Sequence, residues 1–280
     1  SSIVSGGPYK IDKTAPTGVG TLSTTSWTNS NVTITFNASD TGGSGVKRIK
    51  KPDGIWVNAA STTYTVSENG TYTFTIEDNA GNKATVPVNV SNIDKSYPAG
   101  RLIPESSSWV NTNINVKFEV IYTGISGLKY WRYRISSNNG TSWGAWSSNQ
   151  TEMTGTIELI NQGIYKIEVE LCNNANTKVT ITSGSYCIDK TAPTGAFNPN
   201  NAEWTNKDIS VVFTPIDTGG SGVDKWAYRI SNNNGDSWGE WCQYIEGDTK
   251  GTIILSEQGI LLIQAEIFDK AGNKGTVVSG

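Results

Sequence analysis

Alternating apolar and polar positions run through most of the chain. Val32, Ile34 and Phe36 alternate with threonines, and the apolar residues of 70–78 do the same. A period of two in β-branched and aromatic residues is typical of half-buried strands, and Gly, Asn and Asp separate one run from the next. In the first third this pattern predicts strands near residues 17–23, 31–38, 46–51, 61–66, 70–78 and 83–91. No stretch of the chain has the apolar stripe of a capped helix.

The whole pattern recurs three times. The phrase IDKTAPTG occurs at Ile11–Gly18 and Ile188–Gly195, and a looser copy, IDKSYPAG, occurs at Ile93–Gly100. A Trp-led strand and a glycine-rich turn follow each copy in the same order, and such a period indicates an array of one structural unit. We expect repeats at residues 11–92, 93–187 and 188–280. Residues 1–10 are expected to be a tag or the end of a preceding repeat, because Ser1–Gly6 resembles Gly275–Gly280.

Six or seven short strands in a unit of this length indicate a β-sandwich of immunoglobulin type. We therefore predict an all-β chain of three tandem immunoglobulin-like sandwiches in an elongated array. The repeated phrase lies where one unit ends and the next begins. Pro16, Pro98 and Pro193 stand in its three copies, where they fix φ and stop strand pairing. The phrase is predicted to be a short, stiff junction.

Composition narrows the function. The 280 residues carry a net charge of −3 and no His, which argues against a basic nucleic-acid surface and removes the commonest general base and metal ligand. No apolar run could span a bilayer, and no phosphate loop or zinc spacing is present. The odd set Cys172, Cys187 and Cys242 is not a disulfide framework, and a Cys172–Cys187 bridge is the weaker alternative. We expect a protein without enzymatic activity.

The motifs IDKTAPT, WTNSNVTITF, ASDTGGSGV and YTVSENGTYTFTIEDNAGN resemble the bacterial Ig-like repeats of large surface proteins and adhesins. The first repeat matches along nearly its whole length, the third at its ends, and the second less well. The resemblance implies a stalk, a spacer or a binding module on a bacterial surface or a phage tail.

The first candidate site is a calcium site at the junction end of a sandwich. The junction phrase, the glycine-rich turn and a later hairpin supply three aspartates there in two repeats: Asp12, Asp40 and Asp78 in the first, and Asp189, Asp217 and Asp269 in the third. Calcium prefers six to eight oxygen ligands, and some adhesins that resemble this chain use calcium in this way. The alternative is that these side chains only hydrogen-bond their own turns. Because the second repeat has Asp94 but Tyr122 and Asn173, we expect two sites and not three.

The second candidate is a pair of tryptophan hairpins, WRYRISSNNGTSWGAW at Trp131–Trp146 and WAYRISNNNGDSWGEW at Trp226–Trp241. Within them, Ser136–Trp143 and Ser231–Trp238 are similar to the Asp-box, with Asn138 and Asn233 at the Asp position. In proteins that carry it, the Asp-box is usually a structural turn. The tryptophans Trp143, Trp146, Trp238 and Trp241 are therefore expected either to pack under their hairpins or to form a stacking surface for a glycan, with Trp146 and Trp241 the better candidates.

The sequence favours a non-catalytic stalk or adhesion segment of a bacterial cell-surface protein, located outside the cell. The alternatives are a carbohydrate-binding module that uses the tryptophan hairpins and a structural segment of a phage tail or other appendage. The expected partners are a surface glycan or a host protein, and not nucleic acid. We expect a monomer, with a strand-exchanged fibre as the alternative.

Overall fold

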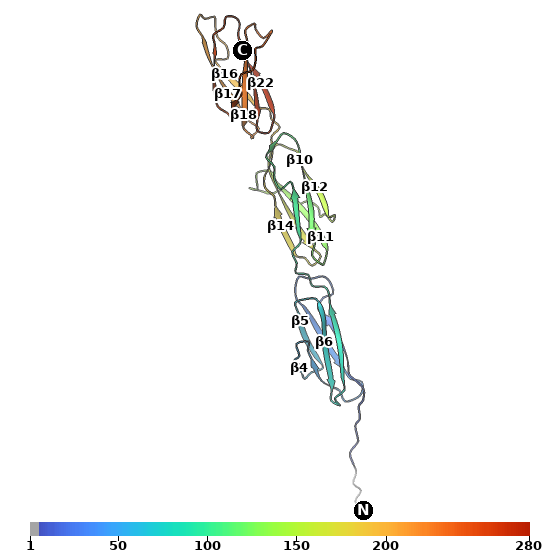
Figure 1. Ribbon diagram of the computed structural model, residues 1–280. Helices are drawn as coiled ribbons and strands as arrows, with labels where there is room; N and C mark the ends of the chain where they lie inside the picture. The colour runs from blue at the N-terminus through green and yellow to red at the C-terminus, as the bar shows by residue number, and fades with distance from the viewer. Residues whose placement is uncertain (1–5) are drawn as a thin grey trace, which may run out of the picture. The chain divides into compact units, whose positions relative to one another are not determined.

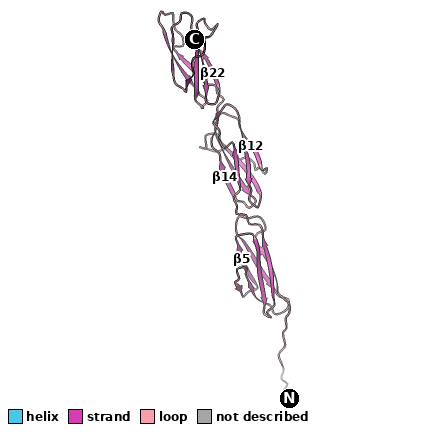
Figure 2. Cartoon of the chain, viewed as in Figure 1, coloured by secondary structure: helices cyan, strands magenta, loops and turns pink. Residues whose placement is uncertain are grey.

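The computed structural model describes residues 6–280. The prediction that Ser1–Gly6 ends a preceding repeat therefore lies outside the described residues except for Gly6. From residue 6 to Pro16 the chain is in no strand, and the elements that follow are strands joined by turns (Figure 2). No helix in the described part of the chain is long and apolar enough to cross a membrane.

The first sandwich is formed by two antiparallel sheets (Figure 1). One sheet has the order β1-β2-β5 and the other the order β4-β3-β6-β7. The strands are β1 (Thr17–Leu22), β2 (Val32–Ser39), β3 (Val46–Lys50), β4 (Trp56–Val57), β5 (Ser61–Val66), β6 (Gly70–Asp78) and β7 (Lys83–Val90). The strands predicted from periodicity are confirmed to within one residue. The two-residue strand β4 was missed because it is too short to show a period.

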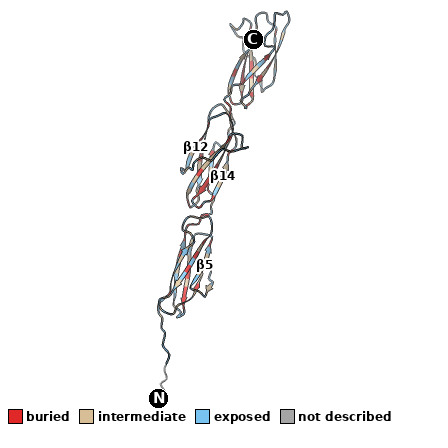
Figure 3. Ribbon diagram, turned by 180° about the vertical axis from the view of Figure 1, so that it is seen from behind, coloured by how far each residue is buried: buried red, intermediate tan, exposed pale blue. Residues whose placement is uncertain are grey.

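The alternating apolar residues of this sandwich meet between its sheets. Phe36 of β2 stacks on Phe74 of β6 with ring centroids 4.3 Å apart. Ile34, Ile49 and Ile76 are completely buried beside them, and Figure 3 shows buried positions alternating with exposed ones along the strands. Burial of side chains of this size contributes about 1.5–3 kcal/mol each.

The second sandwich also has two sheets, one of three strands and one of five. Its three-stranded sheet has the order β12-β10-β8, and its larger sheet has the order β11-β13-β15-β9, with β14 also paired to β13. The strands are β8 (Ala99–Ile103), β9 (Trp109–Val110), β10 (Ile114–Tyr122), β11 (Leu128–Ser136), β12 (Thr154–Leu159), β13 (Gly163–Asn173), β14 (Lys178–Thr182) and β15 (Tyr186–Ile188). Cys187 of β15 pairs with Ile164 of β13. No disulfide joins Cys172 to Cys187 in the described chain.

The third sandwich has the sheet orders β16-β17-β20 and β19-β18-β21-β22. Its strands are β16 (Thr194–Asn198), β17 (Ile209–Ile216), β18 (Val223–Ser231), β19 (Ile245–Glu246), β20 (Gly251–Leu255), β21 (Leu262–Asp269) and β22 (Lys274–Val278). Phe213 packs against Trp226 in its core, with ring centroids 4.7 Å apart. The chain is thus all-β, and its sheets form three immunoglobulin-like sandwiches. In each, the first strand starts directly after the junction proline.

Candidate functional site

The junction phrase connects neighbouring repeats through two adjacent residues, an Ile and an Asp. Ile93 is buried with the core of the first sandwich and forms a parallel bridge with Thr28. The side-chain amide of Asn69 donates to the carbonyl oxygen of Ile93 and accepts from its N–H, both at 2.8 Å. In the next junction Ile188 of β15 is likewise buried and pairs in parallel with Val110 of β9.

The Asp that follows each Ile is held by the glycine-rich turn of the next repeat. Asp94 accepts from the backbone N–H of Ser126 at 2.9 Å, and Asp189 accepts from that of Ser221 at 3.0 Å. Both carboxylates are buried. Two consecutive residues therefore belong to the packing of two successive repeats, which leaves no unpaired linker between them.

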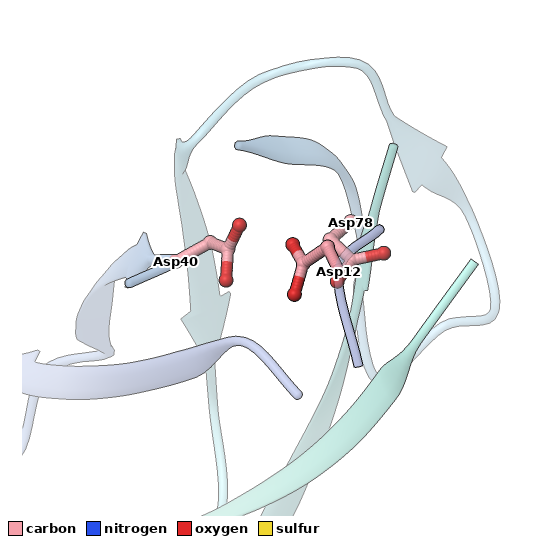
Figure 4. A group of neighbouring side chains, drawn as sticks. All are labelled: Asp12, Asp40 and Asp78. Carbon is pink, nitrogen blue, oxygen red and sulfur yellow. The ribbon is translucent and has the colours of Figure 1, made fainter. Parts of the chain in front are cut away.

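In the first repeat the three predicted aspartates come together. Carboxylate oxygens of Asp12, Asp40 and Asp78 lie within 4.8 Å of one another. Figure 4 shows the carboxylates of Asp12 and Asp40 facing each other, with Asp78 beside Asp12. Asp78 ends β6, Asp40 follows β2, and Asp12 lies in the junction phrase. The antiparallel sheets thus bring residues far apart in sequence to one end of the sandwich.

The third repeat forms the same cluster with Asp189, Asp217 and Asp269, whose carboxylate oxygens also lie within 4.8 Å of one another. Asp189 and Asp269 are buried, and Asp217 is half-buried. Within residues 6–280, no Lys or Arg forms an ion pair with any of the six aspartates. Three carboxylates therefore face one another in each cluster without a neutralising side chain.

Backbone N–H groups of the turns hold the carboxylates in place. Asp40 accepts from Gly42 at 3.0 Å and from Gly45 at 2.8 Å, and Asp12 accepts from Ser44 at 3.1 Å. The turn lies so close to the junction that a Cβ on Gly42 would be 2.0 Å from Asp12 Oδ1, and a Cβ on Gly219 would be 1.9 Å from Asp189 Oδ1. A side chain at either position would push the aspartate carboxylate out of its place.

Hydrogen bonds keep two of these side chains acidic. Bonds from Ser44 and Thr14 hold the pKa of Asp12 below its ordinary value. Burial opposes the ionisation of Asp78, but bonds from Asn82 and Gly81 outweigh it and lower the pKa of that carboxyl. Both groups are therefore charged at neutral pH.

The clusters suit a hard divalent cation in their donor chemistry. Calcium prefers carboxylate and carbonyl oxygens, and a carboxylate oxygen that accepts one hydrogen bond keeps a second lone pair. A cation would also offset the repulsion among three like charges a few ångströms apart. The residues that would hold it are Asp12, Asp40 and Asp78 in one repeat and Asp189, Asp217 and Asp269 in the other.

The second repeat replaces charge repulsion by a hydrogen bond. Asn173 stands at the end of β13, in the place of Asp78, and its Nδ2 donates to Asp94 Oδ2 at 3.3 Å and to the carbonyl oxygen of Ser96 at 3.2 Å. Tyr122 stands in the place of Asp40, and its side chain is 45% exposed. Burial opposes the ionisation of Asp94, yet bonds from Ser126 and Ser96 lower its pKa. This junction is connected without a second acid.

Two residues of the junction ends were not singled out from the sequence. Asn82 Nδ2 donates to the backbone carbonyls of Asp12 and Thr14 at 3.2 Å each and to Asp78 Oδ2 at 2.8 Å. Asn273 Nδ2 does the same for the carbonyl of Asp189, at 2.8 Å, and for Asp269 Oδ2, at 2.7 Å. The repeated AGNK at residues 80–83 and 271–274 was the available signal.

The four candidate tryptophans are half-buried against arginines. The guanidinium carbon of Arg134 lies 5.2 Å from the ring centroid of Trp143 and 4.6 Å from that of Trp146. Arg229 lies 5.3 Å from Trp238 and 4.7 Å from Trp241. The hairpins are closed by Ser and Asn side chains, as where Gly140 donates to Ser136 Oγ at 2.8 Å. Both of the better glycan candidates, Trp146 and Trp241, are therefore stacked on an arginine.

The first repeat contains a stack of the same kind without the long hairpin. Arg48 lies 4.2 Å from the ring centroid of Trp56 and forms an ion pair with Glu77 at 2.8 Å. In the second repeat Arg134 pairs with Glu168, whereas in the third Arg229 donates to the neutral Gln264 at 2.7 Å. The arginine–tryptophan stack is therefore common to all three repeats.

In the third repeat the tryptophans also border a cleft. Trp238, Trp241, Arg229, Glu240 and Glu257 line a surface hollow of about 460 Å³. Two aromatic rings and three charged side chains therefore border the same hollow.

Comparison with models of protein families gave no match, and comparison with curated proteins gave none either. Among solved structures, the chain is similar to part of a bacterial ice-binding adhesin, with 17% identity, 90% of each chain covered and a TM-score of 0.37. It is similar to domains A168–A170 of titin, with 13% identity, 95% of this chain and 99% of that chain covered and a TM-score of 0.36.

It is also similar to invasin, a bacterial integrin-binding protein, with 12% identity, 95% of this chain and 60% of that chain covered and a TM-score of 0.34. These are similarities among tandem β-sandwich proteins. The assignment of the immunoglobulin-like fold rests on the sheet order of this chain itself.

Proposed function

We propose that this chain is a non-catalytic spacer segment of a bacterial cell-surface protein that presents a binding region outside the cell. The observation that carries the proposal is the junction, in which Ile93 and Asp94, and again Ile188 and Asp189, are buried in successive repeats. Such a junction restricts bending between sandwiches because both of its residues are paired or hydrogen-bonded. A spacer needs this restriction and needs no reactive group.

Small-angle scattering of the purified chain tests the spacer role. An elongated particle, with a maximum dimension close to three sandwiches end to end, is expected. Asp94→Ala and Asp189→Ala should broaden the distance distribution, because each removes the carboxylate that holds the next repeat. A compact particle for the unaltered chain would contradict the proposal.

We further propose that the aspartate clusters of the first and third repeats bind calcium and that the second repeat does not. Bound calcium supplies positive charge between three carboxylates, so it stiffens the junction end of each sandwich. The support is the convergence of three carboxylates without a cationic side chain, set against the Asn173–Asp94 hydrogen bond of the second repeat.

Isothermal titration with calcium, after treatment with a chelator, tests the clusters. Two sites are expected for the unaltered chain, one for Asp40→Asn and none for Asp40→Asn combined with Asp217→Asn. Asp53→Asn is the matched control, because Asp53 holds a turn through Ile55 but lies in no cluster. Heat of binding that persists in the double variant would show that the clusters are only turn anchors.

A second candidate function is glycan binding at the cleft beside Trp238 and Trp241. The specific support is the hollow that these rings share with Arg229, Glu240 and Glu257. We interpret the hairpins themselves as Asp-box-like structural turns. A glycan array probed with the whole chain should give signals that Trp241→Ala abolishes. Trp56→Ala is the control, since Trp56 has the same arginine stack without the cleft. An empty array would leave the tryptophans as packing residues.

A further inference from the structure

One buried hydroxyl of the third repeat has no hydrogen-bond partner within residues 6–280. Ser221 lies in the glycine-rich turn and is 4% exposed, and its Oγ forms no hydrogen bond in the described chain. A buried hydroxyl without a partner costs free energy, so such groups are rare in folded proteins. The place of this hydroxyl beside the aspartate cluster indicates what its partner is.

The glycine-rich turn directs the hydroxyl of its serine toward the carboxylates. The N–H of Ser221 donates to Asp189 Oδ2 at 3.0 Å. In the first repeat the N–H of the equivalent Ser44 donates to Asp12 Oδ2 at 3.1 Å. The Oγ of Ser44 also donates to Asp40 Oδ2 at 3.3 Å. The serine of this turn thus lies against two of the three carboxylates, with its hydroxyl on their side.

The second repeat shows how this hydroxyl is satisfied where the cluster is not formed. There Ser126 has the place of Ser221, and its Oγ accepts from the backbone N–H of Ala175 at 3.3 Å. In the third repeat the equivalent N–H, that of Ala271, donates instead to Asp269 Oδ1 at 2.9 Å. The aspartate that completes the cluster therefore takes the donor that the serine uses in the second repeat.

The carboxylates of the third repeat keep lone pairs for a cation. Asp189 accepts one hydrogen bond on each oxygen, from the N–H groups of Thr191 and Ser221. Asp217 likewise accepts one on each oxygen, from N–H groups of its own turn. Each of these oxygens retains a second lone pair. Calcium takes about six to eight oxygen ligands, so one oxygen from each of three carboxylates leaves places for further ligands. A neutral hydroxyl fills one of them without adding to the repulsion among the charges.

We propose that Ser221 Oγ is a fourth side-chain ligand of the cation that the third repeat binds, together with the carboxylates of Asp189, Asp217 and Asp269. The cation is the partner that the buried hydroxyl lacks, and a hydroxyl oxygen is a hard, neutral ligand like the water oxygens that calcium accepts. This inference rests on the proposed calcium binding of the cluster. It is confined to the third repeat, since the equivalent hydroxyl of the first already bonds Asp40.

Calcium titration of Ser221→Ala tests this ligand. Both the variant and its reference carry Asp40→Asn, so that only the cluster of the third repeat binds calcium. The affinity for calcium is expected to fall at least about tenfold, because even residues that only orient metal ligands commonly contribute about 10–100-fold. Isothermal titration of the whole chain, after treatment with a chelator, measures this change.

Stability in the absence of calcium distinguishes a ligand from a structural hydroxyl. In chelator, Ser221→Ala should unfold no more readily than the unaltered chain, because the change removes a buried group that has no partner. With calcium in excess the variant should be the less stable of the two, since it binds the cation more weakly. Denaturant unfolding, with amide hydrogen exchange of residues 209–278 as the readout for the third repeat, measures both.

Two further variants sharpen the test. Ser126→Ala is the matched control, because Ser126 holds a backbone N–H in a repeat without a cluster. It should destabilise the second repeat equally with and without calcium and leave calcium affinity unchanged. Ser221→Cys keeps the size of the side chain but replaces oxygen by sulfur, so it should weaken calcium binding and strengthen zinc binding. The three native cysteines are present in every variant and give the same zinc baseline.

The outcomes separate this proposal from the one on which it rests. Equal calcium affinity of Ser221→Ala and its reference would overturn the ligand role while the cluster remained a calcium site. A loss of stability that is the same in chelator and in calcium would also overturn it, since the hydroxyl would then be structural. If neither cluster of the unaltered chain binds calcium, both proposals are wrong.

Discussion

At the scale of single residues, the junctions depend on where one side-chain amide is placed. In the first and third repeats Asn82 and Asn273 bridge the junction backbone to an aspartate. In the second repeat the amide belongs to Asn173, at the end of its strand, and takes over the contact with the junction. The same contact is thus made from two different sequence positions. When the amide comes from the place of Asn82 and Asn273, the end of the strand can carry the third aspartate of the cluster.

We expect Asn82→Ala to lower the free energy of unfolding of the first repeat by about 1–3 kcal/mol, because the buried carboxylate of Asp78 and two junction carbonyls lose their donor. A urea titration, with amide hydrogen exchange of residues 32–90 as the readout for the first repeat, measures this change. Asn89→Ala is the control, since Asn89 is exposed. Equal stability of the two variants would show that water replaces the amide without cost.

A second residue-scale prediction concerns alkaline pH. Burial raises the pKa of Tyr186 to about 12, and its hydroxyl donates to the carbonyl oxygen of Pro104 at 2.6 Å. In the unfolded chain a tyrosine ionises near pH 10. The folded state therefore holds the proton longer, and the second repeat should lose stability as the pH rises from about 10 to about 12.

Tyr186→Phe should lower the stability of this repeat at neutral pH and flatten its pH dependence in that window. Denaturant unfolding at a series of pH values measures both. Tyr97→Phe, at a side chain that is 70% exposed, should leave the slope unchanged. A slope that is the same in all three proteins would contradict the assignment to Tyr186.

At the scale of elements, periodicity predicted the long strands and missed the short ones. The strands β2, β6 and their counterparts have enough alternating residues to show a period of two. The pairs Thr28–Ile93 and Val110–Ile188 do not, because one or two residues make each contact and the partner is far away in sequence. The aspartate clusters could be predicted because three identical positions recurred in two repeats, whereas the Asn173 substitution shows its role only in three dimensions.

The junction Ile should count as a core residue of the repeat before it. Ile93→Ala is expected to destabilise the first repeat by about 2–5 kcal/mol, the usual cost of removing a buried Ile side chain. The amide hydrogens of residues 32–90 should exchange faster in this variant, because the free energy of unfolding of the first repeat is lower. Ile125→Ala, at an exposed position, is the control. A shift confined to the second repeat would place Ile93 in the other core.

At the scale of the whole molecule, the same sandwich occurs three times, and the repeats differ in a few added features. The arginine–tryptophan stack and the buried Ile–Asp junction recur throughout, while the carboxylate cluster and the long hairpin each occur in two repeats.

Limited digestion with trypsin should distinguish the three copies of the junction phrase. Lys13, Lys95 and Lys190 have the same place in three copies of one phrase. We expect cleavage after Lys10 and Lys13 first, because residues 6–16 are in no strand, and late cleavage after Lys95 and Lys190, whose neighbours Asp94 and Asp189 are buried. Mass spectrometry of the fragments gives the order. Early cleavage after Lys95 would contradict a paired junction.

The parallel pairing of Thr28 with the junction has a mechanical consequence. The N–H of Thr28 donates to Asn92, and its carbonyl accepts from Asp94, both at 2.9 Å. A pull on the chain through Asp94 loads these two bonds in shear, because they lie across the direction of the force and must break together. An antiparallel end would instead unzip one bond at a time. Tension along the chain would therefore meet its first resistance in this region where the first repeat ends.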